Sequence, residues 1–191
     1  MTAMPHRWVL SGGIGSGKSS VSSLLASSGI FVIDADSVGH QVLEPGGAAH
    51  DQVVSRWPET LTDGQIDRRR LAAIVFVDLD QLKELEAITH PHIFGTISRR
   101  VEAFDGQTVV VEMPILAHTL GDGWRRIVVD CPDDLRLSRA VGRGLSREDA
   151  VARMNAQPDR ATWLAAADLV VPNVGTLGEL EETVAALVPS L

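Results

Sequence analysis

The chain has 191 residues, 45% of them hydrophobic, and a formal net charge of −8. This length suits one α/β domain with a substantial core, while the acidic balance argues against general binding to nucleic acid or acidic membranes. No apolar run of the sequence approaches a membrane span of roughly 18 residues, and we expect no export signal. Its only cysteine excludes an internal disulfide, so we expect a cytoplasmic protein.

The first predicted elements surround a glycine-rich loop. An apolar run at residues 7–11 predicts a buried parallel strand, residues 12–19 read Gly-Gly-Ile-Gly-Ser-Gly-Lys-Ser, and a helical pattern follows to about Ser28. Strand, glycine loop, lysine, hydroxyl and helix is the order of a phosphate-binding P-loop. Glycines let successive N–H groups turn inward, and the helix N-terminus adds donors and partial positive charge.

This loop has two competing interpretations. A flexible glycine loop before a helix is the simpler one, but the complete pattern in a strand–helix setting favours phosphate binding. We expect Lys18 to reach the β- and γ-phosphates and Ser19 to ligate Mg²⁺. A dinucleotide fingerprint is excluded, because Lys18 stands where its last glycine would be needed. The chain has only two lysines, Lys18 and Lys83, against 15 arginines.

Residues 30–33 predict a second strand, which ends at Asp34-Ala35-Asp36. If the extended conformation persists, both carboxylates point to the same side of the chain. A helix is expected from about Ser37 to Leu43. Residues 48–105 show little β signal and are predicted to be mainly helical, with a turn at 62–64. A long helical pattern from residue 79 is expected to break at His90-Pro91, with a new helix continuing to about residue 103.

Three more strands are predicted in the second half, at residues 108–112, 126–130 and 169–171. Cys131 follows the middle one and is expected to be a buried, inert thiol without a neighbouring cation. One helix is expected to begin after Asp133 or Asp134, either of which could cap it, and a second after Ser146, which would cap that helix. A third is expected over residues 176–187. The last helix would face inward with the following side chains: Leu177, Leu180, Val184 and Leu187. Strands alternating with helices indicate an α/β fold whose five-stranded, mostly parallel, doubly wound sheet binds ligands at the carboxyl ends of its strands.

Acidic residues occur where three of these strands end. Asp36, or with less support Asp34, is the candidate base for an acceptor hydroxyl, and the alternative is that Asp36 caps the following helix. Glu112 is similar to a Walker-B acid that holds Mg²⁺ through water. Asp130 is expected to be a turn or capping residue.

Several arginines have both functional and ordinary interpretations. Arg139 and Arg143 are four residues apart on a predicted helix beside a glycine-flanked connection, so they could form part of a lid that neutralises a transferred phosphoryl group. The alternative is that both arginines are simply exposed to solvent on the surface of that helix. Residues 68–70 are either an exposed basic turn or a site for the phosphates of a second substrate. His90, taken alone, is expected to be structural.

Taken together, these segments resemble the dephospho-CoA kinase family over nearly the whole chain. The loop is shared by many nucleotide-binding proteins, whereas the Asp-Ala-Asp and His-Pro segments at these distances are far more specific. The matching segments are residues 12–19, 32–36, 42–46, 63–64, 68 with 71, 75–76, 85–91, 114–116, 139 with 143, 153–157, 167–168, and 173 with 175.

The resemblance implies a P-loop kinase that uses ATP with Mg²⁺ to phosphorylate the ribose 3′-hydroxyl of dephospho-CoA, the last step of coenzyme A biosynthesis. The implied catalytic residues are Lys18, Asp36, Arg139 and Arg143. The implied ATP ligands are Gly13, Ile14, Gly15, Ser16, Gly17, Lys18, Ser19, Ser20, Asn173 and Gly175. Those on the acceptor side are Ser11, Asp36, Arg68, His90 and Pro114, and the metal is assigned to Ser19 and, through water, Glu112.

The resemblance also implies an organisation for the single kinase domain of residues 1–191. Residues 1–35, 106–138 and 168–191 form the core, 36–105 a helical CoA-binding region, and 139–167 a small helical lid with the helices after it. We expect a monomer or weak homo-oligomer that binds dephospho-CoA and ATP, and neither nucleic acid nor membrane.

The chain departs from the family pattern in two places. Ala117-His118 stands where the family commonly has an aromatic residue and a glutamate, which affects contacts to the acceptor. Ser20 replaces the usual threonine, a mild change because Ser19 carries the metal role.

Two other classes remain as alternatives. A kinase that acts on another small molecule or on a nucleoside monophosphate would share the ATP half of the site. A GTPase-like switch would read guanine with an Asn-Lys-x-Asp segment, and neither lysine lies in one.

Overall fold

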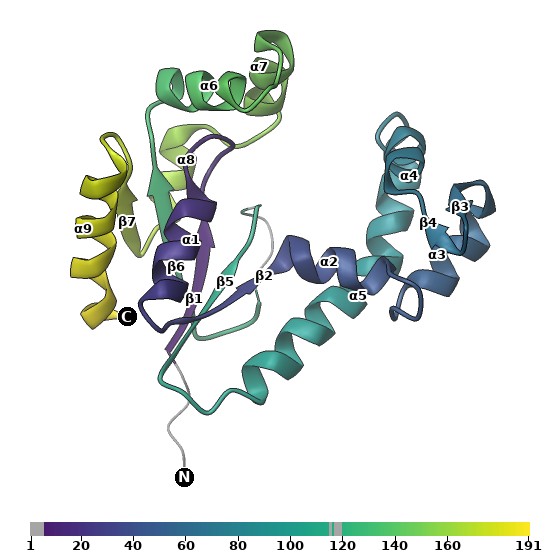
Figure 1. Cartoon of the computed structure of the whole chain (residues 1–191), viewed down its shortest axis with the longest axis horizontal. Helices are drawn as coiled ribbons and strands as arrows, with labels where there is room; N and C mark the ends of the chain where they lie inside the picture. The colour runs from purple at the N-terminus through teal and green to yellow at the C-terminus, as the bar shows by residue number, and fades with distance from the viewer. Residues whose placement is uncertain (1–5, 115, 117–119) are drawn as a thin grey trace. The chain divides into compact units, whose positions relative to one another are not determined.

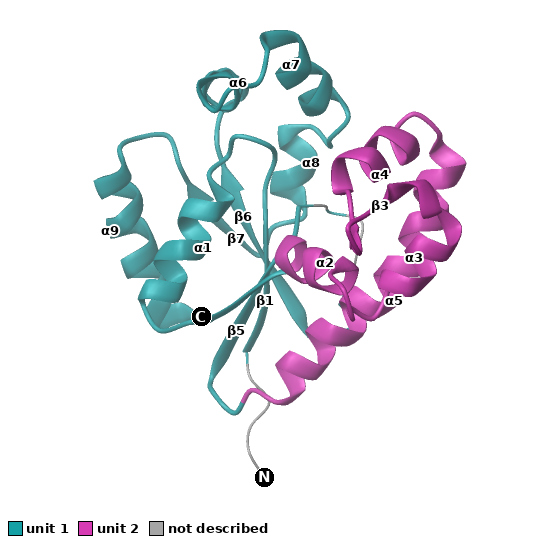
Figure 2. Cartoon of the chain, turned by 45° about the vertical axis from the view of Figure 1, so that its right-hand side comes forward, with its two compact units in different colours: residues 1–34, 105–191 teal, residues 35–104 magenta. Residues whose placement is uncertain are grey.

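The computed structural model describes residues 6–114, 116 and 120–191. The chain divides into two compact units, one formed by Met1–Asp34 with Asp105–Leu191 and the other by Ala35–Phe104 (Figure 2). The bounds of the second unit differ by one residue at each end from the helical region expected at 36–105, and the role assigned to that region stays a prediction.

The first unit contains a five-stranded sheet in which every strand pairing is parallel. Its strands, in spatial order, are β2 (Phe31–Asp34), β5 (Thr108–Glu112), β1 (His6–Ser11), β6 (Trp124–Asp130) and β7 (Leu169–Pro172) (Figure 1). The continuous apolar runs that predict these strands are typical of strands covered on both faces, and residues 109–111 of β5 are completely buried. The expected parallel α/β sheet is therefore confirmed.

Helices α1 (Lys18–Ser27) and α9 (Leu177–Leu187) pack against one another and cover one face of this sheet (Figure 1). Trp8 and Leu10, which alternate along β1, face them in the main core cluster. The remaining helices of the unit are α6 (Asp133–Gly142), α7 (Arg147–Asn155), α8 (Arg160–Ala165) and the 3₁₀ turn Val188–Ser190.

Two expectations about helix ends in this unit are wrong. Pro132 is the N-cap of α6, so Asp133 and Asp134 lie in its first turn, where a carboxylate favours the helix dipole without capping. Leu177 is 61% exposed, because it is the first residue of α9 and lies beyond the buried Leu180. The Ser146 cap is confirmed, since its side chain accepts the backbone N–H of Asp149.

The second unit is mainly helical, but it contains a small hairpin that the sequence prediction missed. Its elements are α2 (Ala35–Leu43), α3 (His50–Arg56), the 3₁₀ turn Pro58–Thr60, β3 (Leu61–Thr62), β4 (Gln65–Ile66), α4 (Arg68–Val75) and α5 (Leu79–Glu102). Between β3 and β4 the chain reverses at Asp63 and Gly64, whose φ angles are 49° and 76°. An Asp-Gly pair with two positive φ angles is typical of a tight hairpin turn.

Helix α5 is continuous through Pro91, so the expected break at His90-Pro91 is wrong. A proline inside a helix removes one backbone hydrogen bond and costs about 3 kcal/mol in isolation. Here α5 packs against α2, α3 and α4 and buries Thr89, Ile97 and Val101. Tertiary packing offsets the local cost. None of the described helices combines the length and apolar character needed to cross a bilayer.

Candidate active site

The glycine loop occupies the connection between β1 and α1, where two glycines have left-handed backbones. Gly15 has a φ of 76° and Gly17 a φ of 96°. A Cβ on Gly15 would collide with the backbone carbonyl group of Arg136, and one on Gly17 with the side-chain amide of Asn173. Both positions therefore require glycine for backbone angle and for space.

The inside of this loop has the features of an anion site. Gly17 is the N-cap of α1 and no side chain caps that end, so the first N–H groups of the helix face the loop with partial positive charge. The Ser16 hydroxyl is buried and has no hydrogen-bond partner among the described residues. A buried polar atom without a partner is costly, and a bound phosphate oxygen would satisfy it. The residues present thus fit a nucleotide phosphate.

Two side chains to which the sequence assigned no role contact the loop, although Gln157 ends one of the segments that match the family. Arg136, on α6, is 4% exposed, and its Nε donates to the carbonyl oxygen of Ile14 at 3.0 Å. Gln157 accepts the Ile14 N–H at 2.8 Å through Oε1. The sequence signal for Arg136 is only an arginine early in a helix, which is usually exposed.

Asn173, expected near the adenine, is attached to the loop itself. Its Nδ2 donates to the carbonyl oxygen of Ser16 at 2.8 Å. Its own carbonyl oxygen accepts a hydrogen bond from Arg139 at 3.1 Å. Beyond it lies a cavity of about 190 Å³ whose lining residues are Pro172, Asn173, Val174, Gly175, Thr176, Glu179, Leu180 and Thr183.

The two arginines expected in a lid differ in their surroundings. The Arg139 guanidinium contacts Asn173 and also donates to Cys131 Sγ at 3.4 Å. Arg143 is the exposed C-cap of α6, and its side chain makes no hydrogen bond or ion pair with the described residues. Arg139 thus lies within α6, whereas Arg143 follows its last residue, Gly142.

Cys131 is buried, as expected, but the expectation that no cation lies near it is wrong, because Arg139 does. Burial raises the pKa of the Cys131 thiol, and the opposing charge of Arg139 is the smaller effect. The thiol therefore stays protonated at neutral pH, in agreement with an inert role.

The acidic strand ends have three different environments. Asp34 lies opposite Glu112 in the β2–β5 register, so two carboxylates stand side by side at the carboxyl edge of the sheet. Asp36 is the second residue of α2, which begins at Ala35, so the extended conformation does not persist through the Asp-Ala-Asp segment. Because a helix cap precedes the first helical residue, Asp36 is not the N-cap of α2, and that alternative is wrong.

Asp130, expected to be a turn or capping residue, is instead an ion-pair partner. Its two carboxylate oxygens accept 2.7 Å hydrogen bonds from Nε and Nη2 of Arg160 on α8. These bonds hold the pKa of Asp130 below its usual value despite partial burial. The pair attaches α8 to the end of β6.

The proposed metal ligands are oxygen donors of the kind that Mg²⁺ prefers. Ser19 is exposed in the first turn of α1, and Glu112 is half-buried at the end of β5. Over residues 6–114, 116 and 120–191, no cluster of three or more His, Cys, Asp or Glu side chains could hold a metal by itself. A metal at this edge would therefore depend on Ser19, phosphate oxygens and water.

Ser11 is completely buried at the end of β1, directly before the loop. Its hydroxyl accepts a 2.7 Å hydrogen bond from Arg126, whose Nη2 also donates to the carbonyl oxygen of Leu116 at 3.3 Å. Partial burial lowers the pKa of Arg126, which nevertheless remains a cation at neutral pH. Pro114 is half-buried after β5, while Ile115 and the Ala117-His118 departure lie outside the described residues.

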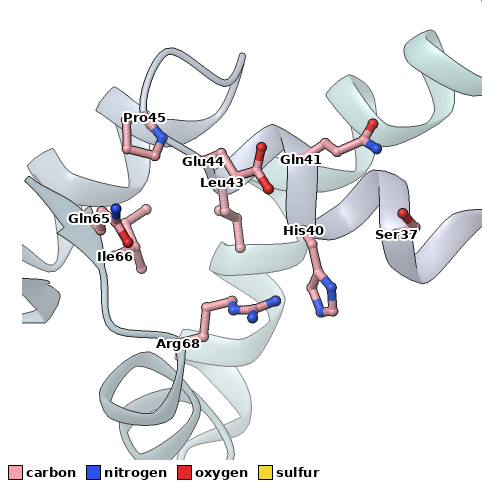
Figure 3. Close-up of a pocket in the computed structure, with 9 residues that line it drawn as sticks. All are labelled: Ser37, His40, Gln41, Leu43, Glu44, Pro45, Gln65, Ile66 and Arg68. Carbon is pink, nitrogen blue, oxygen red and sulfur yellow. The ribbon is translucent and has the colours of Figure 1, made fainter.

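The second unit has a polar cavity of about 340 Å³ between α2 and the β4–α4 connection (Figure 3). Its lining residues are Ser37, His40, Gln41, Leu43, Glu44, Pro45, Gln65, Ile66 and Arg68. Figure 3 shows the Arg68 guanidinium and the His40 ring extending into the same opening. Arg68 was expected on the acceptor side, whereas His40 was missed because a single histidine on an amphipathic helix carries no signal of its own.

His90, also expected on the acceptor side, does not line this cavity. It lies half-buried on α5, with its ring centroid 5.4 Å from that of Phe94.

Comparison with known proteins decides the family. The model of the dephospho-CoA kinase family matches residues 8–179. The chain belongs to the dephospho-CoA kinase family. It is 42% identical to the dephospho-CoA kinase of Thermobifida fusca over 182 residues, which cover 92% of this chain and 91% of that protein.

Solved structures agree with this family. The crystal structure of TT1252 from Thermus thermophilus superposes with a TM-score of 0.84 at 32% identity, covering 99% of both chains. The dephospho-CoA kinase from Campylobacter jejuni gives a TM-score of 0.69 at 27% identity, covering 98% of both chains. The expected P-loop kinase fold is confirmed.

Membership of the dephospho-CoA kinase family confirms the expected activity, which is ATP-dependent phosphorylation of dephospho-CoA in coenzyme A biosynthesis. The substrates are accordingly dephospho-CoA and ATP. The comparisons do not favour the alternative of a kinase for another small molecule or nucleoside monophosphate.

Proposed function

We propose that the loop at residues 12–19 holds the triphosphate of ATP, with Lys18 on the β- and γ-phosphates. One observation carries this proposal: a buried Ser16 hydroxyl without a partner among the described residues lies between Gly15 and Gly17, which both have left-handed backbones. Such a loop presents N–H groups to an anion. Asn173 and Gly175, which line the 190 Å³ cavity after β7, supply the adenine side.

The metal in this proposal is Mg²⁺, held by the Ser19 hydroxyl and, through water, by Glu112. When bound, it neutralises charge on the β- and γ-phosphates. Asp34, directly opposite Glu112 in the sheet, adds negative charge at the same edge. This pair of carboxylates favours a hard divalent cation over a bare phosphate.

Asp36 acts as the base for the acceptor. Its carboxylate accepts the proton of the ribose 3′-hydroxyl while that oxygen forms a bond to the γ-phosphorus and the bond to the ADP oxygen breaks. Asp36 lies in the first turn of α2, at the amino end of the helical region.

Arginines complete the proposed site. Arg143, exposed and without a partner among the described residues, approaches the transferred phosphoryl group, while Arg139 positions Asn173. On the acceptor side, Arg68 brings into the cavity of the second unit a guanidinium, the group that pairs well with phosphate oxygens, and the His40 ring lines the same cavity. Ser11, His90 and Pro114 stay assigned to the acceptor.

We further propose a cytoplasmic monomer or weak homo-oligomer without nucleic-acid or membrane partners. The net charge of −8 supports the absence of general binding to anionic polymers.

A coupled assay of ADP release tests the acceptor chemistry. The purified protein is supplied with ATP and Mg²⁺, and with dephospho-CoA, its 3′-deoxyribose analogue, nucleoside monophosphates or small alcohols. Turnover is expected with dephospho-CoA alone. Turnover of the 3′-deoxy analogue would contradict the assignment of the 3′-hydroxyl as acceptor. Full turnover in the presence of EDTA would contradict the proposed requirement for Mg²⁺.

A further inference from the structure

Ile14 and Gly15 occupy the two central positions of a tight turn inside the glycine loop. The Ser16 N–H donates to the carbonyl oxygen of Gly13 at 3.1 Å and closes the turn. Gly15, the third residue, has a φ of 76°. A positive φ at that position is what a type II turn requires.

The backbone N–H and C=O of Ile14 have no backbone partner inside the turn, and here two side chains bind them. Arg136 Nε donates to the Ile14 carbonyl oxygen at 3.0 Å, and Gln157 Oε1 accepts the Ile14 N–H at 2.8 Å. Arg136 Nη2 also donates to the same Gln157 oxygen at 3.2 Å. The three side-chain bonds form a closed set around one residue, which we call the Ile14 clamp.

The clamp determines how one peptide group is oriented. In a planar trans peptide the C=O and the following N–H point in opposite directions. Because Arg136 holds the Ile14 carbonyl, the N–H of Gly15 points away from Arg136. The Ile14 N–H is already used by Gln157, so in this arrangement it is Gly15, and not Ile14, that offers a donor to a ligand.

The two clamping side chains are themselves fixed. Arg136 is 4% exposed, and its Nη1 donates to Asp133 at 2.9 Å, while its guanidinium lies where a Cβ on Gly13 would be. Gln157 follows the end of α7, and three residues later Arg160 is bound to Asp130 through two 2.7 Å bonds. The segment that carries Gln157 is therefore anchored to the core beside the loop.

We infer that Arg136 and Gln157 are positioning residues for nucleotide binding: they hold the Ile14–Gly15 peptide in the orientation that presents the Gly15 N–H to a phosphate of ATP. This inference rests on the proposed phosphate-binding role of the loop. It also divides the expected lid of residues 139–167, because its last part, from Gln157 onward, belongs to the support of the loop.

Amide exchange in the ligand-free protein tests the clamp without relying on ATP. Gln157→Leu removes the acceptor at similar size, and the Ile14 N–H is expected to exchange about tenfold faster or more, with unchanged global stability. Gln157→Glu keeps an acceptor oxygen for both bonds, so exchange within about twofold of wild type is expected. Gln107→Leu, at an exposed glutamine before β5, is the matched control.

Binding of ATP with Mg²⁺ then tests the consequence. Arg136→Lys keeps the positive charge but loses the planar guanidinium that makes several hydrogen bonds at once. This variant and Gln157→Leu are each expected to weaken ATP affinity about three- to tenfold, which is the scale of one or two hydrogen bonds. Both are expected to raise KM for ATP more than they lower kcat. If Arg136→Lys does not fold, the Gln157 variants carry the test.

Wild-type exchange of Ile14 in Gln157→Leu, or unchanged ATP affinity in either variant, would overturn the inference. Absence of ATP binding by the wild type, with a protected Ile14 amide, would instead count against the proposed function and leave the clamp standing.

Discussion

The side-chain amide of Asn173 donates a 2.8 Å hydrogen bond to the carbonyl oxygen of Ser16, and so connects the end of β7 to the glycine loop. Asn173 is 7% exposed, and its Nδ2 occupies the space that a side chain at Gly17 would need. The loop is therefore supported from the β7 side by one buried polar group.

Replacing Asn173 by alanine should weaken both the fold and ATP binding. The carbonyl oxygen of Ser16 loses its partner, which costs about 1–3 kcal/mol for a buried group. Urea denaturation with and without ATP measures both effects. Asn155→Ala, at the exposed end of α7, is the control and should leave both unchanged. Equal behaviour of the two variants would make the Asn173 contact irrelevant.

Lys18→Ala should reduce kcat by about 10³-fold or more, because phosphoryl transfer depends on the charge that cradles the β- and γ-phosphates. Circular dichroism should show an unchanged fold. The chain provides a matched control in its other lysine: Lys83 is 73% exposed and pairs with Asp80 on the surface of α5, so Lys83→Ala should keep wild-type turnover. Residual activity of Lys18→Ala near wild type would remove Lys18 from the site.

Asp36→Asn should lower kcat on the order of 10²-fold or more while ATP still binds, since the amide cannot take up the acceptor proton. Asp51 is the matched control, because it also lies in the first turn of a helix in the second unit and is fully exposed. Asp51→Asn should keep full turnover. A near-normal kcat for Asp36→Asn would leave Asp36 with an electrostatic role at the start of α2 only.

Arg143→Ala and Arg139→Ala should differ in kind. The Arg143 side chain makes no hydrogen bond or ion pair with the described residues, so its loss should lower kcat more than ATP affinity if it acts in the transition state, and should leave thermal stability unchanged. Arg139 holds the carbonyl oxygen of Asn173, so its loss should lower the melting temperature as well as activity. Steady-state kinetics and calorimetry separate the two, and the reverse pattern would exchange their roles.

The Asp130–Arg160 pair should make stability depend on pH. Its hydrogen bonds lower the pKa of folded Asp130 below the unfolded value of about 4. The pair therefore stabilises the fold above that value, and its contribution is lost as pH falls through the lower, folded-state pKa.

At pH 7, Arg160→Gln should melt about 2–4 °C below the wild type. The difference should shrink below about pH 4, where the wild type loses the same ion pair. Arg56→Gln, which removes the more exposed Arg56–Glu84 pair, serves as the comparison and should change the melting temperature less. A difference for Arg160→Gln that persists unchanged at acidic pH would mean that packing, and not charge, is lost.

Much of the fold could be predicted because its signals are local. Parallel strands covered on both faces are continuous apolar runs, and all five were placed from such runs. The hairpin at residues 61–66 was missed because each of its strands has only two residues, too few to show alternation. The break predicted at Pro91 was wrong because packing around α5 outweighs a missing backbone bond.

The sequence by itself determined the chemistry that the loop can perform: its glycines, Lys18 and Ser19 are neighbours along the chain, and their order alone indicates a phosphate site. Only the tertiary structure decided what supports that loop. Arg136, Gln157 and Asn173 reach Ile14 and Ser16 from 122, 143 and 157 residues away. No periodicity or spacing encodes such contacts, because they arise when separate strands and helices pack at the same edge of the sheet.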